Sequence, residues 1–323
     1  MQRPPTTDRP ARTRSRALRA VMVSVLMLTA TGCWSPAFST QASSPYTLTS
    51  EVIYGRGEVN GGGTFVDLKL DLYRPDDAGP ERRPLVVVVH GGGFVGGSKS
   101  LGHALAWSRE FASRGFIVAS IDYRLEPQDP VPSPRMQPFV DRARTIGVDE
   151  TRIVGPATAI DDTLTALDYL LARDDVEPGQ TTLVGGSAGA ITVDYLTYAL
   201  DDVGIPRPHV AAVISNWGGL PFPGPDQLIQ NPSPTPEDPY SGPPIFLAHA
   251  TGDPTVPYAL STDIDRRAAA VGLPHRLYTK VADRHGFPLE QEVWSPGVSV
   301  LDAQVDFAIC AIRPHLADRP ECA

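Results

Sequence analysis

The fold is decided by the stretch TTLVGGSAG at residues 181–189. A short apolar and β-branched run leads directly into a Gly-x-Ser-x-Gly pentapeptide, and a helical pattern over 189–200 follows it. Glycines on both sides of the serine permit a sharp turn in which the strand and the helix pass close together. Such a turn exposes the serine oxygen at a helix N-terminus, where a developing anion is favoured. The stretch therefore predicts a strand–turn–helix unit with Ser187 as its nucleophile.

Strand and helix patterns alternate outward from this unit. Strands are predicted at 47–54, 64–73, 85–89, 116–121, 181–184, 210–215, 245–250 and 276–281, and helices at 103–114, 159–172, 189–200, 258–271 and 300–312. An antiparallel opening followed by β/α alternation predicts one doubly wound α/β domain over 47–323, with a mostly parallel central sheet. Two Pro-rich segments, 124–156 and 220–244, should lie over the carboxyl ends of the strands, where such sheets bind ligands.

Composition excludes several classes of protein. The chain has 323 residues with 33 Pro and 29 Gly, and no apolar run approaches the roughly 20 residues of a membrane-spanning helix. This argues against a multipass membrane protein, a coiled coil and a solenoid. Beyond residue 32 the chain holds 22 basic and 36 acidic residues, a net charge of −14. Because such a surface repels phosphate backbones, we expect no nucleic-acid partner.

The N-terminus is typical of an export signal. A basic stretch at 12–19 precedes a short apolar core at 20–30, which ends in ATGC at 30–33. ATGC is similar to a bacterial lipobox, so we expect a signal peptide over 1–32, lipidation at Cys33 and a flexible tether over 33–46. Cleavage after Ala42 is the alternative, and it would give a secreted protein instead of a membrane-anchored one.

Two cysteines remain near the C-terminus, Cys310 and Cys322. In an exported protein they can form a disulfide that closes a short loop, and we expect this bridge. The alternative is two unrelated thiols.

A second glycine-rich segment, HGGGF at 90–94, follows the valine-rich strand at 85–89. Consecutive glycines let backbone N–H groups approach a substrate oxygen, so we expect an oxyanion hole from the N–H groups of Gly92, Gly93 and Ala188. A phosphate-binding loop is the rival, but the chain has no G-K-[ST] motif at this point. The other rival is a plain glycine-rich turn.

A serine nucleophile also needs a base and an acid. Of seven histidines, His285 alone occupies a loop just after the last predicted strand, and His249 falls inside a strand pattern. Asp253 follows the strand at 245–250, and the order Ser187, Asp253, His285 is that of an α/β hydrolase. Asp283 is a less suitable acid because it is too close to His285 in sequence. No Cys/His cluster has metal-ligand spacing, so we expect no metal and no cofactor.

The motifs HGGGF, DYRL at 122–125, GGSAG, GDPTVP at 252–257 and the late HGF at 285–287 together resemble a bacterial α/β-hydrolase carboxylesterase. The similarity is to the hormone-sensitive-lipase-like and feruloyl-esterase-like groups, and it covers nearly all of the chain after the leader. It implies the α/β-hydrolase fold. Two departures stand out: Gly186 replaces the usual acidic residue before the serine, and the N-terminal helical cap is missing.

We therefore expect an exported serine esterase that acts on short-chain or polymer-borne esters and has no large lid domain. Phe94 and Trp217 are candidates for the pocket wall, and Asp122 with Arg124 for a structural ion pair. Two other functions stay open: a serine peptidase or amidase with the same triad, and a non-catalytic surface lipoprotein. The sequence leaves the oligomeric state open.

Overall fold

The computed structural model describes residues 44–76, 81–220 and 242–313. The predicted leader, the lipidation at Cys33 and the second disulfide partner, Cys322, lie outside these residues. Strand β1 begins at Tyr46, so the last residue of the predicted tether already belongs to the sheet.

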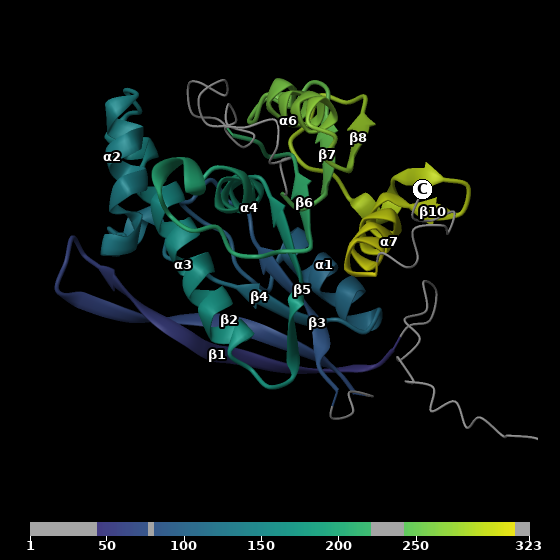
Figure 1. Cartoon of the computed structure of the whole chain (residues 1–323), viewed down its shortest axis with the longest axis horizontal. Helices are drawn as coiled ribbons and strands as arrows, with labels where there is room; N and C mark the ends of the chain where they lie inside the picture. Colours follow the sequence, from purple (N-terminus) through teal and green to yellow (C-terminus); the bar gives the residue numbers. More distant parts are fainter. Residues whose placement is uncertain (1–43, 77–80, 221–241, 314–323) are drawn as a thin grey trace, which may run out of the picture. The chain divides into compact units, whose positions relative to one another are not determined.

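Eight strands of the described part form one sheet in the order β1-β2-β4-β3-β5-β6-β7-β8 (Figure 1). Their bounds are β1 Tyr46–Val59, β2 Thr64–Pro75, β3 Arg83–Val89, β4 Ile117–Ile121, β5 Val176–Gly186, β6 Ala212–Asn216, β7 Ile245–Ala250 and β8 His275–Lys280. The pairs β1–β2 and β2–β4 are antiparallel and the other neighbours are parallel. This is the sheet of an α/β hydrolase, and the predicted fold class is confirmed.

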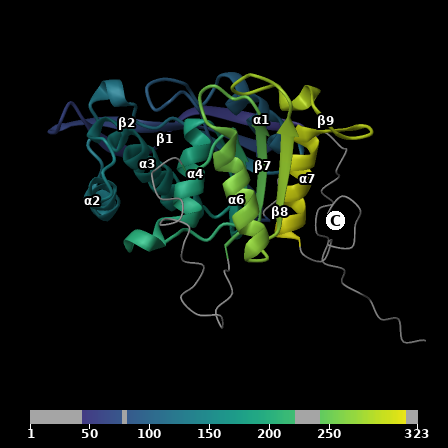
Figure 2. The same ribbon diagram turned by 90° about the horizontal axis from the view of Figure 1, so that it is seen from above.

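Helices cover both faces of the sheet (Figure 2). Helices α3 Val154–Leu171, α4 Ala188–Tyr198 and α6 Tyr258–Ala270 pack on one face, and α1 Gly102–Ser113 and α7 Val300–Ile312 pack on the other. Strand β3 shows why the sequence of a central strand contains an unbroken run of apolar residues. Its Leu85 and Val87 belong to the first core and Val86 and Val88 to the second, because successive side chains point to opposite faces.

The sequence patterns miss some short elements. Helix α2 Gln137–Thr145 lies inside a segment predicted as a Pro-rich loop, and strands β9 Val293–Ser295 and β10 Val298–Ser299 form a small separate ribbon. None of the helices in the described ranges is both long and apolar enough to cross a membrane.

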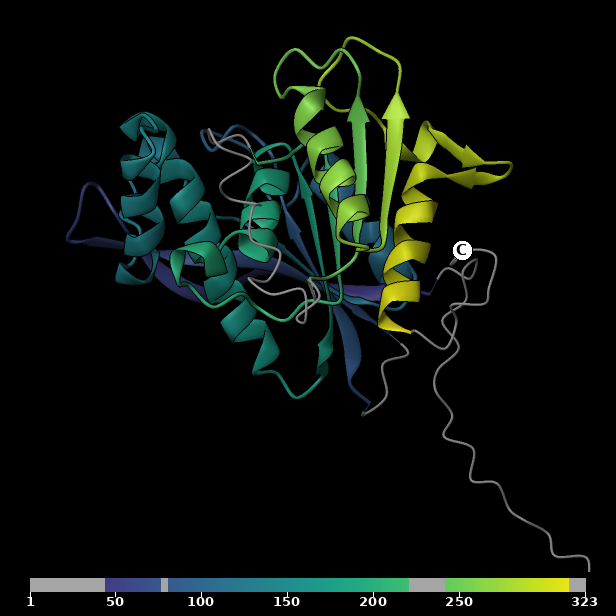
Figure 3. The same ribbon diagram turned by 45° about the horizontal axis from the view of Figure 1, so that its top comes forward.

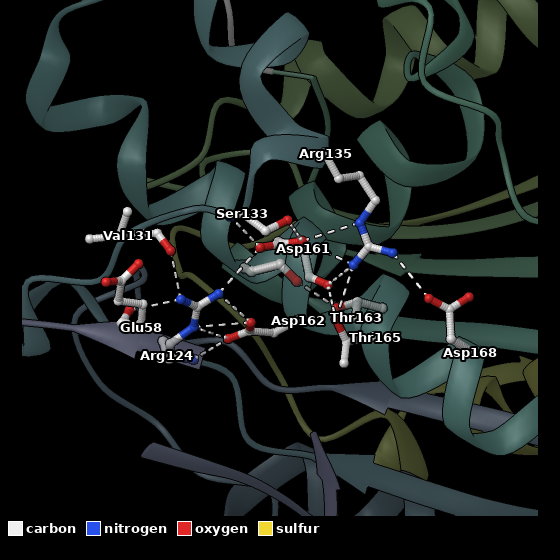
Figure 4. Close-up of polar contacts among 11 residues, drawn as sticks. Glu58, Arg124, Val131, Ser133, Arg135, Asp161, Asp162, Thr163, Thr165 and Asp168 are labelled. Carbon is white, nitrogen blue, oxygen red and sulfur yellow. Dashed lines mark hydrogen bonds and ion pairs between the residues drawn. The ribbon is translucent and has the colours of Figure 1, made fainter. Parts of the chain in front are cut away.

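Helix α3 begins at Val154, five residues before its predicted start, and this changes the role of its two aspartates. Asp161 and Asp162 lie in the middle of the helix and are buried. Arg124 donates to Asp162 Oδ1 at 2.7 Å, and its guanidinium also donates to the carbonyl oxygen of Glu58 at 2.8 Å (Figure 4). The predicted Asp122–Arg124 pair is therefore wrong: Asp122 is paired with Lys99 at 3.0 Å.

This buried ion-pair network fastens the segment after β4 to α3. Asp161 accepts hydrogen bonds from Ser133 at 2.7 and 2.8 Å and is paired with Arg135 at 2.9 Å. Burial disfavours the charge on Arg124, but the adjacent carboxylates outweigh it and raise the pKa of the guanidinium. Burying these charged groups costs desolvation free energy, and the ion pairs and hydrogen bonds offset that cost only while each group keeps its partner.

The arrowheads of β7 and β8 point the same way, so the loops that follow them lie at one end of the sheet (Figure 3). Strands β3, β5 and β6 run parallel to them. Strand β4 is parallel to β3 as well, so the carboxyl ends of six strands meet at this end, as expected for the ligand-binding edge of an open α/β sheet.

Candidate active site

Ser187 occupies the turn between β5 and α4 with φ 55° and ψ −122°. A positive φ at a residue other than glycine is strained and costs on the order of 1–3 kcal/mol unless the surroundings enforce it. The surroundings do so here: Ser187 N–H donates to the carbonyl oxygen of Asn216 at the end of β6, at 2.9 Å. The side chain is thereby held at the end of the sheet, directly before the N-terminus of α4.

Gly186 has a steric reason to lack a side chain. A Cβ at this position would lie 2.5 Å from Cη2 of Trp107 and 3.3 Å from Nε1 of Trp217. The indole of Trp107 is 1% exposed, so it cannot move aside into solvent. The two tryptophans occupy the space next to the nucleophile that an acidic side chain would need, which explains this departure from the esterase pattern.

Three predicted residues form one hydrogen-bonded chain. His285 Nε2 lies 2.8 Å from Ser187 Oγ, and His285 Nδ1 lies 2.7 Å from Asp253 Oδ2. Ser187 follows β5, Asp253 follows β7 and His285 follows β8, so the parallel sheet brings together residues up to 98 positions apart. Asp283, the alternative acid, makes no such contact with the His285 ring.

The carboxylate determines which nitrogen of His285 carries the proton. Burial disfavours ionisation of Asp253, but the N–H groups of Val256 and Thr255 and the His285 ring outweigh it and hold the pKa of Asp253 below its ordinary value. An ionised carboxylate can only accept, so Nδ1 carries the hydrogen. Nε2 is left with its lone pair facing the hydroxyl of Ser187, which is the arrangement that a general base requires.

The glycine loop after β3 borders the same site. Gly92 has φ +122° and Gly93 φ +63°, both in the region that favours glycine. His90 is buried and its Nδ1 lies 2.6 Å from the carbonyl oxygen of Gly91, which belongs to the same peptide plane as the N–H of Gly92. The imidazole therefore fixes the direction of that N–H. Ala188 is the first residue of α4, where backbone N–H groups lack partners within the helix.

A cleft of about 460 Å³ opens over Ser187. Its described lining comprises His90, Gly91, Gly92, Gly93, Gly97, Ser98, Leu101, Gly102, His103, Ala104, Trp107, Gly186, Ser187, Trp217, Thr255, His285 and Gly286. None of these residues carries a carboxylate, an ammonium or a guanidinium group. Burial lowers the pKa of His90 and of His103, which favours their uncharged forms. The cleft therefore suits an uncharged ligand.

The two candidate pocket residues have different positions. Trp217 lines the cleft with φ +41° and packs against Phe287 at 5.2 Å. Phe94 is 9% exposed, packs in the core with Tyr123 and is not among the residues that line the cleft. It has φ +65°, a backbone conformation that residues other than glycine rarely adopt. Of the two candidates, Trp217 borders the cleft and Phe94 packs in the core.

His103 was not singled out from the sequence, yet it lines the cleft. Its ring lies 4.8 Å from that of Trp217 and 5.7 Å from that of Trp107. The spacing of His103 and Trp107 on one helix face was the available signal. Within the ranges that the structure covers, no group of three His, Cys, Asp or Glu side chains could hold a metal ion.

The sheet order and the strained serine turn define the α/β-hydrolase fold. A family model described as BD-FAE matches residues 70–137, which include the glycine loop. An acetyl-hydrolase of Streptomyces hygroscopicus is 29% identical over 135 residues, 42% of this chain and 36% of that protein. Gut esterase 1 of Caenorhabditis elegans is 29% identical over 133 residues, 40% of this chain and 20% of that protein. The match thus spans about a third of the length of the acetyl-hydrolase and a fifth of the length of gut esterase 1.

Solved structures share the fold. A truncated carbohydrate esterase from gut microbiota superposes with TM-score 0.58 at 15% identity, over 84% of this chain and 98% of that one. Esterase 2 of Thermogutta terrifontis, phosphorylated by paraoxon, gives TM-score 0.56 at 20% identity, over 85% and 95% of the two chains. The resemblance to α/β-hydrolase esterases is confirmed.

Proposed function

We propose that this protein is a serine carboxylesterase that hydrolyses uncharged carboxylic esters through an acyl-enzyme. The observation that carries the proposal is the hydrogen-bonded chain of Ser187, His285 and Asp253 at the carboxyl edge of the sheet. The esterase and acetyl-hydrolase relatives support the same reaction class.

Each group has one role in the proposed reaction. Ser187 Oγ attacks the ester carbonyl carbon while His285 Nε2 takes the hydroxyl proton. The N–H groups of Gly92, Gly93 and Ala188 hold the oxyanion, and each such donor contributes about 10²–10³-fold to the rate. His285 then gives its proton to the leaving alcohol as the C–O bond breaks. Water attacks the acyl-enzyme, again with His285 as base, and the acid is released.

Asp253 keeps the imidazole in the required tautomer and stabilises the imidazolium that forms in both half-reactions. Its side chain is fully buried and three-quarters of the His285 side chain is covered, so solvent screens this interaction weakly. The hydrogen-bond partners are in place before substrate arrives, which removes the reorganisation cost that water would impose.

The cleft favours short acyl groups or ester groups displayed on a larger uncharged molecule. Trp107 and Trp217 are both almost fully buried and fill the space beside the nucleophile, so they limit the depth available to an acyl chain. The rim is more accessible, because Leu101 is 66% exposed. A clear preference for acyl chains beyond about twelve carbons would contradict this part of the proposal.

The proposal is tested with p-nitrophenyl esters from C2 to C12, assayed with wild-type protein and with Ser187→Ala. We expect activity on short chains, lost in the variant by about 10⁴-fold or more. Reaction with an organophosphate should label Ser187 covalently, which mass spectrometry of the peptide detects. A folded wild type that is neither active on esters nor labelled would refute the proposal. Turnover of amides instead would point to the peptidase alternative.

We also propose that the protein is exported and carries lipid on Cys33, on the strength of its N-terminal sequence. Incorporation of labelled palmitate by wild-type protein and not by Cys33→Ser is the expected result. Labelling of neither protein, with secretion into the medium, would support cleavage after Ala42.

A further inference from the structure

A second histidine lies behind the acid of the triad. His249 is on β7, four residues before Asp253, and its Nε2 lies 3.2 Å from Asp253 Oδ2. Neither side chain has exposed surface. The sequence pattern places His249 inside a strand and assigns it no role, and the proposed mechanism does not use it.

The partners of His249 determine its tautomer. Nε2 faces the carbonyl oxygen of Val256 at 3.0 Å as well as Asp253 Oδ2. A carbonyl oxygen and an ionised carboxylate can only accept, so Nε2 must carry a hydrogen. Nδ1 lies 2.7 Å from the hydroxyl oxygen of Ser261 on α6, and the carbonyl oxygen of Gly218 lies 3.3 Å from the same hydroxyl. With hydrogen on Nε2, the hydroxyl donates its one proton to the nearer acceptor, Nδ1. Burial lowers the pKa of His249, and a neutral ring with hydrogen on Nε2 fits both sets of partners.

These contacts close a ring around the carboxylate. Asp253 Oδ1 accepts from the N–H groups of Thr255 at 2.8 Å and Val256 at 3.0 Å. Asp253 Oδ2 accepts from His285 Nδ1 and also faces the Nε2–H of His249. Val256 is held twice, by Asp253 through its N–H and by His249 through its carbonyl oxygen.

We propose that His249 is a positioning residue for the reaction: its Nε2–H holds the Asp253–Val256 turn, so that Oδ2 keeps one orientation toward His285. This inference rests on the proposed function and goes beyond it, since a triad requires only Ser187, His285 and Asp253. The physical reason is that displacement of a catalytic group by about 1 Å can cost on the order of 100-fold in rate.

A matched pair of amide variants separates positioning from packing. The amide nitrogen of glutamine reaches the place of Nε2, so His249→Gln keeps a donor toward Val256 and Asp253. The amide of asparagine reaches only the place of Nδ1, so His249→Asn keeps the Ser261 side and loses that donor. Both substitutions bury an uncharged amide in the same site.

We expect kcat of His249→Asn to fall about tenfold or more with little change in KM, and that of His249→Gln to stay within about threefold of wild type. Ser261→Ala removes the partner of Nδ1, together with the longer contact to the carbonyl oxygen of Gly218, and leaves the Nε2 side intact, so its kcat should also stay within about threefold of wild type. Circular dichroism verifies that each variant is folded at the assay temperature. If the asparagine and glutamine variants have equal kcat, His249 has a structural role only and the proposal fails.

Two NMR measurements need no substrate. The downfield proton resonance of the His285–Asp253 hydrogen bond should shift in His249→Asn and stay in place in His249→Gln. In wild-type protein, the ring ¹⁵N shifts of His249 should report hydrogen on Nε2; hydrogen on Nδ1 would overturn the inference even if the variants do not fold. If the His285–Asp253 resonance shifts in His249→Asn but the wild-type protein hydrolyses no ester, the proposed function is refuted and the positioning of Asp253 by His249 is still supported.

Discussion

Replacing Gly186 by alanine tests whether Trp107 is the reason for a glycine before the nucleophile. The added Cβ would lie 2.5 Å from Trp107 Cη2, whereas carbon atoms in good contact are about 3.5–4.0 Å apart. The indole must therefore withdraw by roughly 1 Å, within a core that leaves it 1% exposed. Gly186 does not have a positive φ, so alanine adds no backbone strain.

The magnitude follows from two opposing contributions. Overpacking of this kind costs about 1–3 kcal/mol. The smaller conformational entropy of alanine in the unfolded chain offsets about 0.4–1 kcal/mol of that cost. We therefore expect Gly186→Ala to lower the free energy of unfolding by about 1–2 kcal/mol.

A double-mutant cycle with Trp107→Phe identifies the cause. Phenylalanine has no atom in the place of Cη2, so alanine at 186 should cost at least about 1 kcal/mol less in that background. Urea unfolding followed by circular dichroism measures all four proteins, with m-values compared to check that the denatured state is unchanged. If Gly186→Ala costs the same in both backgrounds within about 0.5 kcal/mol, or stabilises the wild type, the steric argument is refuted.

Three further predictions concern the acid, the ion-pair network and a buried carboxyl group. Asp253→Asn should lower kcat by about 10⁴-fold in a folded protein, because an amide can donate to Nδ1 and stabilise the wrong tautomer of His285. Steady-state kinetics measures the change, and a loss of less than about tenfold would contradict the prediction. Asp162→Asn should destabilise the fold by about 3–5 kcal/mol, because Arg124 loses a buried charged partner. The control Asp168→Asn, at an exposed position, should cost less than about 1 kcal/mol. Urea unfolding measures both variants, and equal costs would contradict a stabilising role for the buried network. Burial raises the pKa of Asp194 from 3.8 to about 8, against hydrogen bonds from Ser215 and Gly219. The folded state then binds the proton more tightly than the unfolded state, so this contribution to stability is full below about pH 4 and is lost as the pH rises through about 8. Asp194→Asn should flatten the decline in stability between pH 6 and pH 8, measured by thermal unfolding in a pH series, and an unchanged decline would argue against a protonated Asp194.

The linear sequence was informative where the chemistry is local. The strand–turn–helix around Ser187 needs glycines at set positions, and the run at 85–89 needs apolar side chains on both faces, so each could be recognised from neighbouring residues. The loop positions of Asp253 and His285 followed from the strands before them, because parallel strands end at one edge of the sheet. The structure brings these two side chains and Ser187 into hydrogen-bond distance.

Interactions between distant segments could not be read in this way. Phe94 and Trp217 are both aromatic residues next to motifs of the site, but Phe94 packs in the core beside Tyr123, whereas Trp217 borders the cleft. Arg124 lies two residues from Asp122, yet it pairs with Asp162 because α3 packs beneath the segment after β4.

The sequence by itself determined the α/β-hydrolase fold and a short set of candidate reactive residues, because strand periodicity, turn glycines and loop positions are local properties of the chain. Only the tertiary structure decided that His249 lies beside Asp253 in addition to His285, and why residue 186 has no side chain. Those outcomes depend on the packing of β7 against α6, and of α1 against β5, over distances of a few ångströms. Contacts between elements far apart in sequence are specified by the whole core at once, and no single segment encodes them.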